Sequence, residues 1–288
     1  MRILILGITG MLGSAIYREL CKEKKHDVWG TLRSERGLRY FSTEHHDKLL
    51  CNIDVLDHDN LINVFETVRP EVVINCVGLI KQLADSKSPL TALPINAMLP
   101  HRLANISSLM GARLIHISTD CVFSGTKGMY VESDTSDAED LYGKSKYIGE
   151  VIDRSHAITL RTSIIGHELN SQASLVDWFL SQGRVVEGYK KAIFSGLPTV
   201  ELASVINNHI LPAPNLSGLY HVSVEAIDKY SLLKLIADIY QKNIEITRDE
   251  QVCINRSLDS TKFQRDTGYK VPEWGYLINK MYESQKGG

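Results

Sequence analysis

The sequence predicts an α/β protein whose strands form one parallel sheet with helices on both faces. Residues 2–6 are a continuous apolar run, as expected of a strand buried on both faces of such a sheet. Further apolar runs alternate with helical patterns as far as residue 165. Because alternating strands and helices pair their strands in parallel through right-handed crossovers, we expect a doubly wound sheet.

The first half of the chain supplies six strands and the helices between them. We expect strands at residues 2–6, 27–31, 49–54, 71–77, 112–117 and 157–162, and helices at residues 14–24, 57–68, 89–111 and 138–155. The second of these helices is closed by Pro70, and the third pattern, which carries Asn96, is interrupted by Pro94 and Pro100. The ligand crevice of such a sheet lies at the carboxyl ends of its strands.

A glycine-spaced turn joins the first strand to the first helix, with Gly7, Gly10 and Gly13 at intervals of three. Three glycines let the chain turn tightly, let its backbone approach a pyrophosphate, and let the helix pack closely on the strand. The free N–H groups and dipole of the helix N-terminus favour the phosphates. The turn therefore predicts a Rossmann-type dinucleotide site, and a plain glycine-rich turn is the alternative.

The end of the second strand favours NADPH as the cofactor, with NADH as a weaker alternative. An NAD-preferring site has an acidic residue there, but this chain continues Leu32-Arg33-Ser34-Glu35-Arg36. Glu35 lies three residues beyond the expected position, and an arginine such as Arg33 can pair with a 2'-phosphate. The alternative is a solvated basic loop.

After residue 165 the strand–helix alternation weakens. We expect helices at residues 174–182, 228–240, 260–267 and 274–282, a strand at residues 216–222, and a Gly-Leu-Pro-Thr motif within residues 192–200. Residues 1–165 are therefore expected to form the NADP-binding Rossmann domain, with some exchange of segments. Residues 166–288 are expected to form a smaller, helix-rich α/β cap that binds the substrate.

The composition excludes several classes of partner and site. The 32 basic and 34 acidic residues give a net charge of −2, so we expect no nucleic acid and no membrane as partners. No stretch approaches the roughly 18 apolar residues that cross a bilayer, and the first apolar run is too short for a signal peptide, so we expect a cytoplasmic protein. The five cysteines include no C-x-x-C pair, no histidine falls at zinc-ligand spacing, and we expect no metal.

The chemistry is expected from Tyr142 and Lys146, which lie four residues apart on one face of a helix. The same spacing occurs in three other pairs: Tyr230/Lys234, Tyr276/Lys280 and Tyr282/Lys286. Only Tyr142 follows a predicted strand that ends in Ser118-Thr119-Asp120 and also lies downstream of the glycine turn. This context indicates a dinucleotide-dependent carbonyl reductase.

The roles of these side chains follow from their ordinary chemistry. A phenol titrates near a pKa of about 10, and the charge of Lys146 can stabilise its anion, which suits Tyr142 to general acid catalysis. In a ketone reduction the nicotinamide supplies hydride to the carbonyl carbon while Tyr142 protonates the oxygen. The hydroxyl of Thr119 or Ser118 would hold that oxygen. The alternatives are a strand-ending residue for Thr119, a turn former for Asp120, and a core residue for the mid-strand histidine.

These motifs together resemble the extended short-chain dehydrogenase/reductases, and within them the dTDP-4-dehydrorhamnose reductase group, over nearly the whole chain. The stretches that carry the resemblance are residues 7–13, 69–75, 96, 118–123, 142–146, 161–163, 196–199, 218–221 and 256–263.

The resemblance implies a catalytic set, a cofactor site and a substrate site. The catalytic set would be Thr119, Tyr142 and Lys146. The cofactor would lie along Gly7, Gly10, Met11, Leu12, Gly13, Arg33, Asp54, Val77, Gly78, Ser118, Tyr142 and Lys146. The substrate site would include Lys81, Thr119, Asp120, Ile164 and Arg256.

The implied activity is an oxidoreductase that reduces the C4 ketone of a nucleotide-activated 4-keto-6-deoxysugar for polysaccharide biosynthesis. Ile164 stands where the rhamnose enzymes usually have an aromatic residue, so a UDP-linked 2-acetamido-2,6-dideoxy-4-keto hexose is an alternative substrate. A second alternative is an NADP-binding regulatory subunit, since the same family includes one of methionine adenosyltransferase. The resemblance leaves a homodimer open. Relatives that bind magnesium use a carboxylate early in the first helix, which here begins Ser14-Ala15-Ile16-Tyr17.

Overall fold

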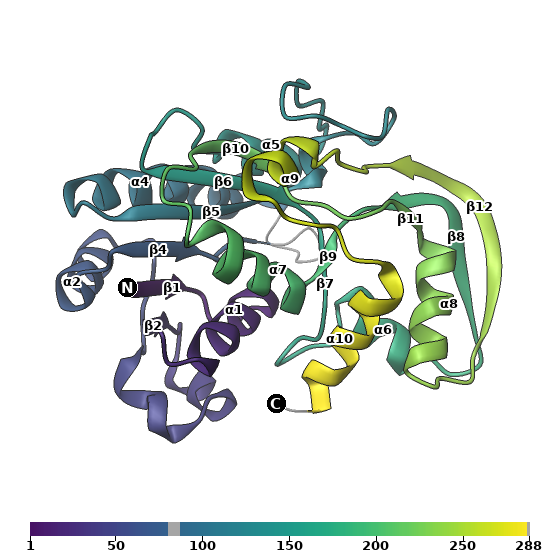
Figure 1. Cartoon of the computed structure of the whole chain (residues 1–288), viewed down its shortest axis with the longest axis horizontal. Helices are drawn as coiled ribbons and strands as arrows, with labels where there is room; N and C mark the ends of the chain where they lie inside the picture. The colour runs from purple at the N-terminus through teal and green to yellow at the C-terminus, as the bar shows by residue number, and fades with distance from the viewer. Residues whose placement is uncertain (80–86, 287–288) are drawn as a thin grey trace.

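The computed structural model describes residues 1–79 and 87–286 (Figure 1). The main sheet has seven strands in the order β10-β6-β5-β4-β1-β2-β3, and every pairing in it is parallel. The predicted α/β fold with a parallel, doubly wound sheet is confirmed. The strands are β1 (Arg2–Leu6), β2 (Asp27–Thr31), β3 (Leu49–Leu50), β4 (Val72–Asn75), β5 (Arg113–Thr119), β6 (Ala157–Thr162) and β10 (Gly218–His221).

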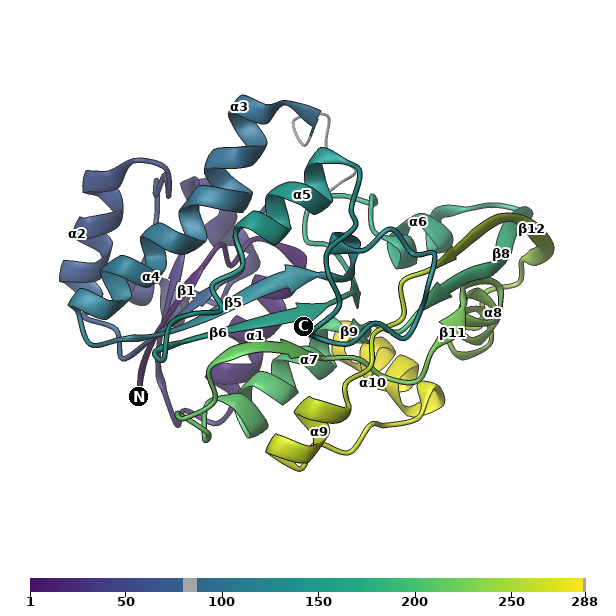
Figure 2. The same cartoon turned by 90° about the horizontal axis from the view of Figure 1, so that it is seen from above.

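Helices cover both faces of this sheet because alternate strand residues point to opposite sides. Ile3 and Ile5 of β1 belong to the core under α1 (Met11–Lys22) and α7 (Thr199–Val205). Leu4 and Leu6 belong to the core under the two helices of the opposite face. Figure 2 shows the two layers, with α2 (His58–Val68) and α4 (Leu99–Leu109) on the side of the sheet opposite α1 and α7.

Two boundaries near the predicted site differ from expectation. Helix α1 begins at Met11 and not at residue 14, because the turn ends at Gly10, which takes the N-cap position. Helix α5 (Leu141–Ile148) ends seven residues before the predicted residue 155. Gly149 takes the C-cap position, where a Cβ atom would lie 2.0 Å from the carbonyl oxygen of Asn96, so glycine lets the end of the helix pack closely against η4.

The segment predicted as one long helix with two prolines is a continuous helical run whose central part is π-helical. It consists of α3 (Pro89–Ala92), a π-helical segment η4 (Leu93–Met98), and α4. Pro94 and Pro100 lack the N–H that a regular α-helix needs, which is consistent with the change of hydrogen-bond pattern between them. Asn96 lies in the π-helical segment and is almost fully buried.

Between β2 and β3 the chain forms two short 3₁₀ helices that the sequence did not predict. They are η1 (Glu35–Tyr40) and η2 (Thr43–Lys48), and β3 is reduced to two residues. The basic residues of this loop, Arg33, Arg36 and Arg39, are exposed.

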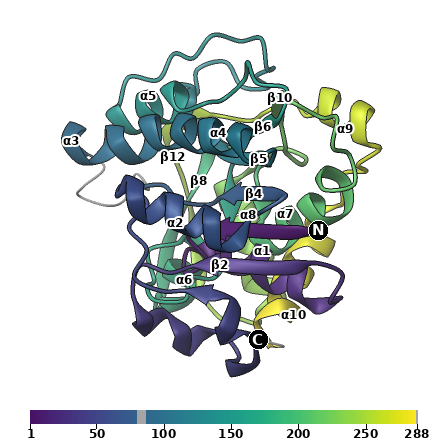
Figure 3. The same cartoon turned by 90° about the vertical axis from the view of Figure 1, so that its left-hand side faces the viewer.

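The second half contains a small mixed sheet that the sequence did not predict. Its order is β11 (Ile227–Asp228), β8 (Val185–Phe194), β12 (Glu245–Asn255), with β8 parallel to β12 and antiparallel to β11. Helices α6 (Leu175–Ser181), α8 (Lys229–Ile239) and α10 (Trp274–Lys286) contribute to its core. A further pair, β7 (Ile164–Ile165) and β9 (Leu197–Pro198), leads into this region. In Figure 3 the small sheet lies behind the main sheet.

One segment of the second half returns to the first. After α7 and a π-helical segment η6 (Ile206–Ile210), the chain enters β10, which pairs with β6 at the edge of the main sheet. Phe263 of α9 (Thr261–Thr267) and the side chains of α7 share the core that covers β1.

A buried ion pair lies beneath the carboxyl ends of β5 and β6. Arg161 Nε and Nη2 each donate to a carboxylate oxygen of Glu150 at 2.7 Å. Ser118 Oγ donates to the same carboxylate at 2.7 Å, and Arg161 Nη1 lies 3.3 Å from His221 Nε2. Burial and the Arg161 charge lower the pKa of His221 to about 4, so this ring is neutral and accepts from the guanidinium. Every charge in this buried cluster is therefore paired.

We expect Glu150→Gln to destabilise the fold strongly, because it leaves the Arg161 guanidinium buried without its anion. Breaking one side of a buried pair costs about 3–5 kcal/mol. Asp153→Asn is the control, since Asp153 pairs with Arg154 at 3.7 Å on the exposed surface and its loss should cost at most about 1 kcal/mol. Urea unfolding measures the free energy of unfolding of both variants and of the parent. Similar small losses of stability in the two variants would contradict the expectation.

Candidate active site

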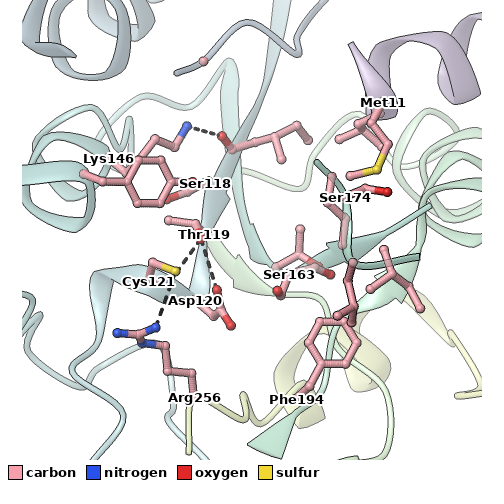
Figure 4. A pocket seen from close by; sticks show the side chains of 18 of the residues that line it. Met11, Ser118, Thr119, Asp120, Cys121, Lys146, Ser163, Ser174, Phe194 and Arg256 are labelled. Atoms are coloured by element: carbon pink, nitrogen blue, oxygen red, sulfur yellow. Dashed lines mark hydrogen bonds between the residues drawn. The ribbon is translucent and has the colours of Figure 1, made fainter. Parts of the chain in front are cut away.

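A cleft of about 610 Å³ opens at the carboxyl ends of the main strands (Figure 4). On one side it is lined by segments that follow β1, β4, β5 and β6, and on the other by β8, β12 and the start of α8. The lining includes Gly10, Met11, Leu12, Val77, Gly78, Ser118, Thr119, Asp120, Cys121, Tyr142, Lys146, Ile164, Phe194, Lys229 and Arg256.

Helix α5 brings Tyr142 and Lys146 to the end of β5. The helix is capped by Asp140, whose carboxylate accepts from the N–H of Gly143 at 2.8 Å. A Cβ atom on Gly143 would lie 2.3 Å from the carbonyl oxygen of Cys121. Only glycine therefore lets α5 approach the residues that follow β5 this closely.

Lys146 is buried and donates from Nζ to the carbonyl oxygen of Ile117 at 2.7 Å. Its Nζ also lies 3.9 Å from the position that a Cβ atom of Gly78 would take. Burial lowers the pKa of Lys146 to about 8, although the charges of Glu150 and Cys76 act in the opposite direction. The ammonium is thus bonded to β5 and lies close to the segment that follows β4, in a poorly solvated place.

Burial raises the pKa of the Tyr142 phenol, and the charges of Cys121 and Asp120 add to this shift. The nearby hydroxyl of Thr119 acts in the opposite direction. The net shift is therefore upward, and the stabilisation of the phenolate that was expected from the charge of Lys146 does not outweigh burial here, where the ammonium donates to the carbonyl oxygen of Ile117. Tyr142 keeps its proton at neutral pH, as a proton donor must.

Thr119 and Asp120 form a hydrogen-bonded pair at the end of β5. Thr119 Oγ1 donates to Asp120 Oδ1 at 3.1 Å and accepts from the N–H of Cys121 at 3.1 Å. Burial raises the pKa of Asp120, against the opposing charge of Arg256. The single hydroxyl proton of Thr119 must leave Asp120 before it can be donated to a substrate oxygen.

Asn96 connects helix α5 to the segment that follows β4 through two hydrogen bonds. Its Nδ2 donates to Ser145 Oγ on α5 at 3.2 Å, and its Oδ1 accepts from the N–H of Leu79 at 2.9 Å. Ser118 lines the cleft, but its hydroxyl is engaged by Glu150. A contact between Ser118 and a cofactor is therefore expected from its backbone.

The glycine turn has the features of a phosphate cradle. Gly7 has a φ of +81°, a conformation that favours glycine, and a Cβ atom on Gly13 would lie 2.3 Å from the carbonyl oxygen of Gly7. Gly10 leaves the entry of α1 without a side chain, and neither a side-chain cap nor an acidic residue occupies the first turn of this helix. These residues fit a dinucleotide pyrophosphate, which needs bare backbone and free N–H groups.

Arg33 and Asp54 lie at the neighbouring edge of the sheet, outside the lining of the cleft. The N–H of Ile53 donates to the carbonyl oxygen of Leu32 at 3.0 Å, so the segments that carry Arg33 and Asp54 run side by side. Asp54 is exposed, and its Oδ1 accepts from the N–H of Leu56 at 2.9 Å.

The predicted substrate residues Thr119, Asp120, Ile164 and Arg256 all line the cleft, whereas Lys81 lies outside the described residues. Arg256 donates from Nε to the carbonyl oxygen of Phe123 at 2.7 Å, and its Nη1 lies 3.8 Å from Cys121 Sγ. Figure 4 shows its guanidinium beside Cys121 and Asp120.

Sequence reasoning missed the residues that the small sheet and its helices supply, among them Ser174, Phe194, Lys229 and Ile254. A weak sequence signal for β8 was available, because Val186, Gly188, Ala192 and Phe194 place small or apolar residues at alternate positions, and these are the positions that the structure buries. Strand β12 is charged and has no fully buried residue, so it offers no comparable pattern.

Within residues 1–79 and 87–286, no group of three or more His, Cys, Asp or Glu side chains could hold a metal ion. No helix in these ranges has the length and apolar character needed to span a membrane.

The family of the RmlD substrate binding domain matches the chain over residues 1–286. Methionine adenosyltransferase 2 subunit beta of Danio rerio is 30% identical over 255 residues, which cover 83% of this chain and 74% of that protein. A Haloferax volcanii protein named probable low-salt glycan biosynthesis reductase is 31% identical over 165 residues, which cover 56% of this chain and 52% of that protein. The crystal structure of dTDP-4-dehydrorhamnose reductase from Bacillus anthracis in complex with NADP has a TM-score of 0.79 at 22% identity and covers 98% of this chain and 99% of that one. These matches confirm the resemblance inferred from the motifs.

The burial of Lys146 predicts a stability that rises with pH. Above its pKa of about 8 the folded chain releases this proton, while the unfolded chain holds it until its ordinary pKa of 10.5. Because the unfolded state then binds more protons, the free energy of unfolding should increase relative to Lys146→Met by on the order of 2 kcal/mol between about pH 7 and about pH 9.5. Lys144→Met, on the exposed side of the same helix, is the control and should follow the parent. Denaturant unfolding at both pH values measures this free energy. If the difference in free energy of unfolding between the parent and Lys146→Met is the same at both pH values, the prediction is refuted.

Proposed function

The chain belongs to the RmlD substrate binding domain family, and from this premise we propose that it is an NADPH-dependent reductase of the C4 ketone of a nucleotide-activated 4-keto-6-deoxysugar. One observation carries the proposal. A protonated tyrosine, a buried lysine and a strand-end threonine meet in a single cleft, and the same cleft is lined by the start of α1 beside a bare glycine turn.

The residues that would hold the cofactor run from the glycine turn to α5. Gly7, Gly10 and Gly13 shape the turn, and Met11 and Leu12 begin the helix whose N-terminus would face the pyrophosphate. Val77, Gly78, Ser118, Tyr142 and Lys146 continue the same wall of the cleft, with Arg33 and Asp54 at the adjacent edge of the sheet. When bound, NADPH supplies the hydride that reduces the carbonyl carbon.

Tyr142 acts as the general acid in this proposal. A phenol is protonated at neutral pH, and burial raises the pKa of this one further, so its proton is available to the carbonyl oxygen and is transferred as negative charge develops there. The charge of Lys146, one helical turn away, favours the phenolate that this transfer leaves. Thr119 lies beside Asp120 at the end of β5, where its hydroxyl can hold the same oxygen once its proton turns away from the carboxylate.

The substrate side is the wall made by β7, β8, β12 and Arg256. Apolar side chains such as Ile164 and Phe194 face the polar catalytic end across the cleft, an arrangement suited to a sugar ring with a methyl group at C6. A dTDP-linked 4-keto-6-deoxysugar is the first candidate, and a UDP-linked 2-acetamido-2,6-dideoxy-4-keto hexose is the second. Product formation would serve polysaccharide biosynthesis in the cytoplasm.

A second candidate function is that of an NADP-binding regulatory subunit. It is favoured by the 30% identity to methionine adenosyltransferase 2 subunit beta. The complete set of Thr119, Tyr142 and Lys146 in one cleft favours the enzyme instead. Stable capture of a methionine adenosyltransferase catalytic chain, combined with no turnover of nucleotide-linked 4-keto sugars, would favour the subunit.

We expect the purified protein to oxidise NADPH when it is given dTDP- or UDP-linked 4-keto-6-deoxysugars, and Tyr142→Phe to slow this reaction by about 10²- to 10⁴-fold, the usual contribution of a general acid. NADPH affinity should be nearly unchanged, because the aromatic ring is retained. Tyr147→Phe, on the exposed face of the same helix, should keep full activity. Turnover is followed by NADPH absorbance, and equal rates for parent and Tyr142→Phe would remove Tyr142 from the mechanism.

Arg33→Ala should weaken the binding of NADPH much more than that of NADH, because only NADPH carries the 2'-phosphate that an exposed guanidinium at the end of β2 can pair with. We expect a loss of about tenfold or more for NADPH and a change of less than about twofold for NADH. Arg18→Ala, on an exposed position of α1, is the control. Fluorescence titration gives both affinities, and equal losses for the two cofactors would contradict this assignment.

A further inference from the structure

His116 is a fully buried histidine in the middle of β5 that no step of the proposed reaction uses. It pairs in register with Asn75 of β4 on one side and with Thr159 of β6 on the other. All three side chains are buried, so they form a polar row across the centre of the main sheet. The row lies on the same face as Leu114, which belongs to the core that α4 covers.

The hydrogen bonds of this row decide which nitrogen of the imidazole carries the hydrogen. Asn75 Oδ1 accepts from the N–H of Val77 at 3.1 Å, which fixes the orientation of the amide. Asn75 Nδ2 therefore faces His116 Nδ1, at 3.1 Å, and donates to it. Since Nδ1 accepts, the hydrogen is on Nε2. Burial and the charges of Lys146 and His101 hold the pKa of His116 well below its usual range, so the ring is neutral, as this bond requires.

The packing of the core does not by itself account for a histidine at this position. Among residues 1–79 and 87–286, no group forms a hydrogen bond with His116 Nε2, although this atom is buried. An unpaired buried N–H costs stability, and an apolar side chain such as that of Leu114 would avoid this cost. A residue that breaks a packing rule in this way is expected to serve the site. What His116 supplies, and an apolar residue could not, is the acceptor for Asn75.

The segment that Asn75 holds lies between the glycine turn and Lys146. Val77 packs against the turn, since a Cβ atom on Gly7 would lie 2.9 Å from Val77 Cγ2. Gly78 lies beside Lys146, whose Nζ is 3.9 Å from the position of a Cβ atom on Gly78. Val77 and Gly78 both line the cleft. A turn of the Asn75 amide would release the N–H of Val77 and so loosen the wall between the glycine turn and Lys146.

We propose that His116 is a positioning residue for the cofactor, which fixes the backbone of Val77 and Gly78 through its hydrogen bond with Asn75. This inference rests on the proposed function, which places NADPH along this wall of the cleft. His116 touches no reacting atom. It keeps the Asn75 amide in one orientation, and the amide keeps the N–H of Val77 in place.

The test measures NADPH affinity by fluorescence titration of the full chain. His116→Leu removes the acceptor and should weaken NADPH binding by about 5- to 20-fold, the effect of one lost buried hydrogen bond. His116→Asn should stay within about twofold of the parent, because the amide of asparagine ends where Nδ1 lies and its oxygen can accept from Asn75. The amide of His116→Gln ends near Nε2 instead, so this variant should behave like His116→Leu.

Thr159→Val is the matched control for a loss of stability. The Thr159 hydroxyl donates to the carbonyl oxygen of Val151 at 2.8 Å and accepts from the N–H of Val151 at 3.2 Å. The substitution therefore removes buried hydrogen bonds from the same row without touching the segment after β4. It should lower the temperature of thermal unfolding and leave NADPH affinity unchanged. Thermal unfolding of every variant shows which of them are folded.

Several results would overturn the inference. These are an unchanged NADPH affinity in folded His116→Leu, an equal loss of affinity in Thr159→Val, or a loss in His116→Asn as large as that in His116→Gln. If His116→Leu does not fold, the comparison of the Asn and Gln variants carries the test. A parent protein that binds no NADPH would overturn the inference as well. The proposed reaction fails separately, if the parent binds NADPH and shows no turnover in the NADPH assay.

Discussion

The close approach of α5 to the end of β5 is the constraint on which the site depends. Gly143 lies against the carbonyl of Cys121 and Gly149 against that of Asn96, so the helix is held at both ends by contacts that exclude any side chain. The hydrogen bond from Lys146 to Ile117 then joins the helix to the strand through a buried charge. Tyr142 and Thr119 come together because glycine at these two positions lets the helix lie this close to the strand end.

Burial sets the proton affinities of the two central side chains of the site. The lysine has a lowered pKa and the tyrosine a raised one, and both shifts come first from loss of solvent. Beneath them the Glu150–Arg161 pair, Ser118 and His221 form a fully hydrogen-bonded cluster that fixes the ends of β5 and β6. The polar groups of the cleft therefore lie next to a buried cluster in which every charge is paired.

The sequence predicted the main sheet and one wall of the cleft well, because both depend on local signals. Continuous apolar runs marked the parallel strands, and the glycine spacing marked the turn. The other wall was not predicted, because Phe194, Lys229 and Ile254 come from segments whose pairing is set by tertiary contacts and not by their own pattern. The direction of the Tyr142 shift was also missed, because spacing along a helix gives no measure of desolvation.

The return of the chain from α7 to β10 also decides how this molecule can be divided. A fragment that ended near residue 165 would leave β6 with an open row of backbone donors and acceptors, a template for aggregation. It would also uncover the apolar side of α1 that α7 normally shields. The complementary fragment would keep a strand with no sheet to join. The two halves are therefore expected to fold as one cooperative unit, and the part that contains the small sheet cannot be exchanged between relatives as a separate module.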